Sequence, residues 1–179
     1  MHVEVKKMAT AGLLVAFSVV MMLLSSVIET SSLFFIAAAS FCVGVAVREW
    51  GLRLGFAFLI ASVSLSFLVA PGKLYCFTFA GMGLYIWTSE WLWNRIADAT
   101  MLKGRNVILW IGKYMIFNLL YVPVLLLAPQ ILFTGKMNGL SAIIFWLFGQ
   151  AVLFIYDVAY RYFQAQVWGR LRGRLLKKH

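Results

Sequence analysis

Charged and metal-binding residues are scarce in this sequence. Only 12% of its 179 residues are charged, and 6 acidic residues stand against 16 basic ones. The two histidines, His2 and His179, are terminal, and the two cysteines, Cys42 and Cys76, do not form a C-x-x-C motif. A metal site needs several such ligands at a characteristic spacing. We therefore expect neither a metal centre nor a bound cofactor.

Catalytic motifs are also missing from the sequence. It contains no H-E-x-x-H, no G-x-S-x-G and no Walker A Gly-Lys-Ser/Thr, the motifs that mark zinc proteases, serine hydrolases and ATPases. Its serines and threonines have no histidine nearby in sequence, and its carboxylates do not pair at catalytic spacing. We therefore expect that the chain is not an enzyme.

Apolar residues dominate instead. They make up 63% of the chain, and the mean hydropathy is +0.90, well above the values typical of soluble domains. Since about 20 apolar residues cross a bilayer as a helix, the sequence predicts an all-α polytopic membrane protein with six transmembrane helices in one compact bundle over residues 1–163. The six predicted spans are roughly 8–28, 32–50, 52–70, 74–94, 107–132 and 140–163.

The positive charges lie at the ends of these spans. Of the 16 Lys and Arg residues, only Lys73 and Lys136 fall in the expected outer loops, and only Lys113 lies well inside a span. The other 13 lie in the inner loops, in the tails or at the inner ends of the spans. Cytoplasmic loops of membrane proteins carry an excess of Lys and Arg. We therefore expect a cell-membrane protein with both termini in the cytoplasm, and no nucleic-acid partner despite the net charge of +10.

The basic C-terminal tail, residues 164–179, has two interpretations. Its apolar residues recur at helical spacing among arginines and lysines, a pattern typical of an amphipathic helix lying in the membrane interface. The alternative is a simple topology anchor, because Gly169 and Gly173 weaken a helix.

Several polar residues fall inside the predicted spans. Glu90 lies roughly 6 Å, and Lys113 and Asp157 roughly 9 Å, from the inner ends of their helices at 1.5 Å per residue. Their similar depths predict a buried structural ion cluster of Glu90, Lys113 and Asp157. Lys113 and Asp157, at the same depth, are expected to pair, in preference to forming a substrate site. Asn118 and Gln150 lie nearer the midplane, where they are placed to hydrogen-bond across the hairpin formed by the last two spans.

Small residues recur on one face of the first span. Ala9, Gly12 and Ala16 follow the spacing i, i+3, i+7, and such a strip lets another helix approach closely in lipid. The other helix belongs either to a partner protein or to this same chain, and the sequence leaves both open.

Four stretches carry a resemblance to a known family. In chain order they are residues 6–16 (Lys-Lys-Met-Ala-Thr-Ala-Gly-Leu-Leu-Val-Ala), 48–55 (Arg-Glu-Trp-Gly-Leu-Arg-Leu-Gly), 113–118 (Lys-Tyr-Met-Ile-Phe-Asn) and the pair Tyr156 and Asp157. The first resembles the substrate-binding S component of energy-coupling factor (ECF) transporters, and the other three resemble uncharacterised S-component-like membrane proteins. Chain length, six spans and cytoplasmic termini add to the likeness.

The resemblance implies a function. S components capture a vitamin or other small nutrient from the outer side, and they dock a transmembrane T component that engages two cytoplasmic ATPases. The docking strip would be Ala9, Gly12 and Ala16. The ligand, mostly apolar or aromatic, would contact a set of residues in the outer half, namely Glu29, Lys73, Tyr75, Tyr121, Gln130, Lys136, Asn138, Trp146 and Gln150.

Two alternatives stay open on sequence grounds. One is a non-catalytic integral subunit of another membrane complex, without a ligand of its own, whose outer half is filled by side chains. The other is a membrane enzyme or lipid carrier, in which the cluster of Glu90, Lys113 and Asp157 opens to water or lipid headgroups.

Overall fold

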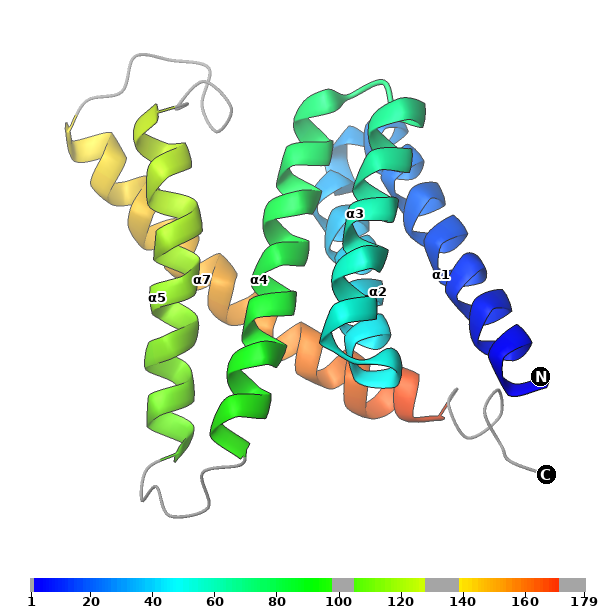
Figure 1. Cartoon of the computed structure of the whole chain (residues 1–179). Coiled ribbons are helices and arrows are strands. Elements are labelled where there is room, and N and C mark those ends of the chain that lie inside the picture. Colours follow the sequence, from blue (N-terminus) through cyan, green and yellow to red (C-terminus); the bar gives the residue numbers. More distant parts are fainter. Residues whose placement is uncertain (1, 98–104, 128–138, 171–179) are drawn as a thin grey trace. The chain divides into compact units, whose positions relative to one another are not determined.

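A computed structural model describes residues 2–97, 105–127 and 139–170 of the chain (Figure 1). The described residues contain helices and no strands, which confirms the predicted all-α fold. The elements, in chain order, are α1 (His2–Val27), η1 (Glu29–Ser31), α2 (Ser32–Trp50), α3 (Leu52–Val69), α4 (Lys73–Ala97), α5 (Arg105–Leu127), α7 (Gly139–Tyr162) and η2 (Phe163–Trp168).

The described helices are those of a polytopic membrane protein. Five of them contain a segment long and apolar enough to cross a bilayer, namely Lys7–Val27, Ser32–Trp50, Leu52–Val69, Val107–Leu125 and Ile143–Trp168. The remaining long helix, α4, has 25 residues, so it is long enough to cross as well, although it is less apolar than the other five.

The chain divides into two compact units, residues 1–113 and 114–179. The single membrane domain over residues 1–163 stays a prediction.

The first unit is a bundle in which α2 packs against α1, α3 and α4 (Figure 1). Its central helix is the most buried, since 56% of the α2 span is inside the structure against 17% of the α1 span and 28% of the α3 span. Small side chains permit this central place, because Ala39, Ser40, Gly44 and Ala46 are all buried on α2. As a result α1 is peripheral and leaves much of its surface uncovered.

Among the described residues, two clusters of buried side chains lie in this bundle. The outer cluster lies toward the end where α1 finishes and α2 begins, and it consists of Met22, Ile36, Ala39, Ala70, Cys76 and Phe79. The inner cluster consists of Cys42, Val43, Ala46, Val47, Phe58 and Leu59.

The turn between α2 and α3 is fastened to α4. It runs through Gly51, whose φ of 87° is in the left-handed region that favours glycine. The Trp87 indole on α4 donates a hydrogen bond of 2.9 Å to the carbonyl oxygen of Leu52. Arg48 on α2 donates from Nε (2.9 Å) and Nη2 (2.6 Å) to the Oε1 atom of Glu90 on α4. These contacts hold the end of the bundle where α3 begins.

Candidate functional site

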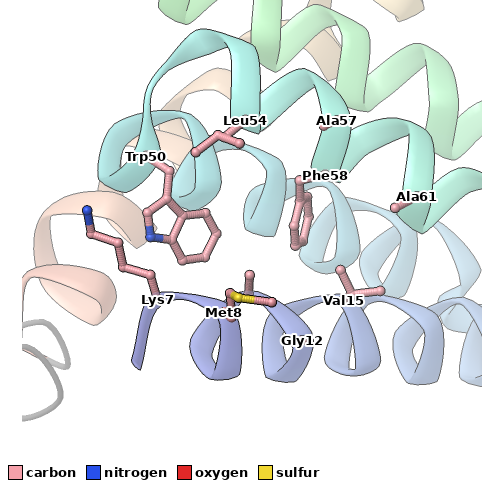
Figure 2. A pocket seen from close by; sticks show the side chains of 10 residues that line it. Lys7, Met8, Gly12, Val15, Trp50, Leu54, Ala57, Phe58 and Ala61 are labelled. Carbon is pink, nitrogen blue, oxygen red and sulfur yellow. The ribbon is translucent and has the colours of Figure 1, made fainter. Parts of the chain in front are cut away.

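An open groove runs between α1 and α3 in the first unit (Figure 2). Its volume is about 340 Å³. Its lining comes from three helices, with Lys7, Met8, Ala11, Gly12 and Val15 on α1, Trp50 on α2, and Leu54, Ala57, Phe58 and Ala61 on α3. We call it the α1–α3 groove.

The groove stays open because its walls carry small residues. A Cβ atom added at Gly12 would meet no other atom within 4 Å, and Ala57 and Ala61 are exposed on α3. Among the lining residues whose side chains the structure describes, Lys7 alone is charged, and it lies with Trp50 at the end of the groove where α1 and α3 begin (Figure 2). The α1–α3 groove is therefore apolar along its length, with a positive charge at one end.

The predicted docking strip lies beside this groove. Ala9, Gly12 and Ala16 are all exposed, and Gly12 belongs to both features. The first unit therefore leaves the strip uncovered. Docking of a partner through it stays a prediction.

In the second unit, α5 and α7 are joined by polar side chains. Trp146 Nε1 and Gln150 Nε2 each donate a hydrogen bond of 2.9 Å to Asn118 Oδ1. The hydroxyl of Tyr121 donates to the carbonyl oxygen of Phe145 at 3.0 Å. The predicted hydrogen bond between Asn118 and Gln150 is therefore confirmed. Trp146, Gln150 and Tyr121, three of the predicted ligand contacts, come together at this α5–α7 crossing.

Two features of the α5–α7 crossing bear on ligand binding. The Tyr121 ring packs directly against Gly149, where a larger residue would not fit, because an added Cβ would lie 2.6 Å from Tyr121 Cε1. Gln150 Oε1 is buried and accepts no hydrogen bond from any described residue. A buried amide oxygen left without a donor is unfavourable, so this atom is suited to accept a hydrogen bond from a bound molecule.

The other predicted ligand contacts are not gathered there. Lys73 donates to the carbonyl oxygens of Phe67 and, at 3.3 Å, of Ala70, and its ammonium lies 4.6 Å from the Phe67 ring centroid. Lys73 therefore supplies hydrogen-bond donors to carbonyl groups at the C-terminal end of α3. Tyr75 packs against the outer cluster.

Four of the predicted contacts lie where no side chain is described. The backbone of Glu29 is in η1, and the structure describes nothing of its side chain. Gln130, Lys136 and Asn138 lie outside the described residues.

The acidic members of the predicted ion cluster have arginine partners. Glu90 is 5% exposed and pairs with Arg48 at 2.6 Å. Asp157 is 1% exposed and its Oδ2 lies 3.1 Å from Arg161 Nε, one helical turn along α7. The Lys113 ammonium lies 5.8 Å from the Trp110 ring centroid. Lys113 and Asp157 belong to different units, so their pairing stays a prediction.

Sequence reasoning missed both arginine partners. The i, i+4 spacing of Asp157 and Arg161 is a readable signal for a pair on one helix. No spacing signals Arg48 and Glu90, because they lie on helices that are not consecutive in the chain.

The start of the tail is helical. A π-helical segment, η2, continues α7 over Phe163–Trp168 and buries Gln164 and Trp168. The residues beyond Arg170 lie outside the described part of the chain. The interfacial helix and the topology anchor therefore both stay open.

No family model, curated protein or solved structure matches this chain. A functional assignment therefore depends on the groove, the strip and the α5–α7 crossing themselves.

Replacing Asn118 with leucine is expected to loosen the α5–α7 crossing. Leucine fills a similar volume but accepts no hydrogen bond, so the Trp146 indole and the Gln150 amide lose their shared acceptor. Interhelical hydrogen bonds in membranes contribute on average about 0.6 kcal/mol each, so a loss of about 1 kcal/mol for two is expected in denaturant unfolding in micelles. Leu119→Ala, at an exposed neighbouring position, is the control. Equal effects of the two substitutions would contradict the proposed importance of the crossing.

Proposed function

We propose that this chain is a non-enzymatic integral membrane subunit that docks a partner membrane protein through α1, and specifically an S component of an ECF-type uptake transporter. The exposure of Ala9, Gly12 and Ala16 carries the proposal. Small residues are needed where two helix backbones come close in lipid. On a surface that only faces lipid, larger apolar residues would serve equally well.

The position of α1 supports the same proposal. Only 17% of its span is buried, so a helix can approach without displacing any part of the first unit. Under the S-component proposal the approaching helix belongs to a transmembrane T component, which engages two cytoplasmic ATPases.

Capture of a small nutrient is the second part of the proposal. The α5–α7 crossing supports it with two aromatic side chains, Tyr121 and Trp146, and with the buried acceptor Gln150 Oε1. A planar, mostly apolar molecule with a hydrogen-bond donor would suit this combination. Native mass spectrometry of the gently purified protein tests it by detecting a retained small molecule.

A second candidate function is an integral subunit of another complex without a ligand. It is favoured by the outer cluster, where Met22, Ile36 and Phe79 are at most 1% exposed and fill the outer half of the first unit. It differs from the first candidate in predicting no retained small molecule and a partner other than a T component.

The docking strip is tested by co-purification with an ECF module consisting of a T component and two ATPases. Ala9→Leu and Ala16→Leu are expected to reduce the recovered module at least tenfold, because each leucine would hold the partner backbone away from α1. The control is Ala151→Leu at an exposed position on α7. Undiminished co-purification of both strip variants would rule out docking through this strip.

A further inference from the structure

The α1–α3 groove has the polarity of an amphiphilic ligand. The described residues of its lining are apolar except for Lys7, which places a positive charge at one end (Figure 2). Trp50 lies at the same end, and tryptophan prefers the headgroup level of a bilayer. Arg53 is exposed on the first turn of α3, one residue before Leu54 of the lining. A molecule with an anionic head and an apolar tail would place its head beside Lys7 and its tail along the apolar part of the groove.

The length of the groove fits one leaflet of the membrane. Its α1 lining runs from Lys7 to Val15, eight residues apart, which corresponds to about 12 Å of helix. The hydrocarbon core of a bilayer is about 30 Å thick, so one leaflet is about 15 Å. A partner transmembrane helix would need a contact surface over the whole thickness, whereas an acyl chain of one leaflet needs only this half.

We propose that the α1–α3 groove binds an anionic phospholipid of the leaflet on the Lys7 side. One acyl chain lies along Gly12, Ala57 and Ala61, and the headgroup phosphate pairs with the ammonium of Lys7. The charge distribution of the chain predicts that this side is cytoplasmic, and the cytoplasmic leaflet is the one rich in anionic lipid.

This site shares Gly12 with the proposed docking strip but otherwise uses a neighbouring side of α1. The groove uses the side of α1 that faces α3, while Ala9 and Ala16 lie outside its lining. Lipid binding is a property of the isolated chain and needs no partner. Its failure and the failure of docking are therefore distinguished by different substitutions and different measurements.

Native mass spectrometry of the purified full-length chain tests the proposal. The protein is mixed with equimolar phosphatidylglycerol and phosphatidylcholine carrying identical acyl chains. We expect phosphatidylglycerol to be retained in preference. Lys7→Gln should lower the retention of phosphatidylglycerol about fivefold, which is the effect of one lysine near an anionic surface. The control is Arg95→Gln, which removes an exposed charge from the last turn of α4. It should leave retention near that of the unchanged protein.

Filling the groove tests the acyl-chain half of the site. Ala57→Trp and Ala61→Leu are expected to abolish the preferential retention, and Ala159→Leu, an exposed alanine on α7, is the control. Unfolding in micelles checks that each variant is folded, and Ala61→Leu makes the smaller change should Ala57→Trp fail to fold. Unchanged retention in Ala61→Leu would overturn the groove as the site. Equal losses in Lys7→Gln and Arg95→Gln would overturn the headgroup contact and indicate non-specific attraction.

Discussion

Replacing Arg48 with methionine is expected to destabilise the first unit by about 3 kcal/mol. The Glu90 side chain is 7% exposed and receives two hydrogen bonds from the Arg48 guanidinium. Removing Arg48 takes both of these hydrogen bonds from the buried Glu90 carboxylate. Removing one partner of a buried ion pair typically costs about 3–5 kcal/mol. The expected value is at the low end of this range because the Arg48 side chain is 41% exposed. Denaturant unfolding in micelles measures it.

Two further variants separate the buried charge from other causes. Arg48→Met combined with Glu90→Leu removes both charges and should recover most of the lost stability. Arg53→Met, at an exposed arginine on the first turn of α3, should change it by less than about 0.5 kcal/mol. A double variant as unstable as Arg48→Met alone would show that the pair does not fasten α2 to α4 as described.

The helix boundaries could be read from the sequence almost completely. The apolar runs predict spans at 32–50 and 52–70, and the structure has α2 at Ser32–Trp50 and α3 at Leu52–Val69. The reason is local. A membrane span must be continuously apolar and helical along its own length, and Gly51 supplies the turn between these two helices.

Contacts between consecutive helices were also accessible. The hydrogen bond between Gln150 and Asn118 follows from two polar residues near the midplane of antiparallel neighbours. Connectivity alone brings such neighbours together, so depth along each helix was enough to predict the pair.

Contacts between non-consecutive helices were not accessible in the same way. The sequence gives the depth of Glu90 but not the rotation of α4, nor the fact that α2 packs against it. The pairing of Arg48 with Glu90 depends on both. The α1–α3 groove was missed for the same reason, since the strip on α1 was visible but its neighbour α3 was not.

The close approach of α2 to α3 at Gly55 was hidden for another reason: the sequence makes these two helices neighbours but does not say where their backbones come close. It gives the second large expected effect. Gly55→Ala should destabilise the first unit by about 2 kcal/mol through overpacking. An added Cβ would overlap the Val47 side chain and lie 2.9 Å from Val47 Cα. A side chain can rotate away from such a contact, but a backbone atom moves only if α2 and α3 separate. Unfolding in micelles measures the change.

Gly12→Ala is the matched control, because it makes the same substitution in another apolar helix of the same unit. No atom lies within 4 Å of the new Cβ at Gly12, and alanine favours a helix over glycine by about 1 kcal/mol. Gly12→Ala should therefore leave stability unchanged or raise it, so that the two variants differ by about 2–3 kcal/mol. Equal stabilities would show that α2 and α3 do not approach at Gly55. A loss at Gly12 would show that α1 is covered by another part of the chain, and both the docking strip and the lipid groove would then be wrong.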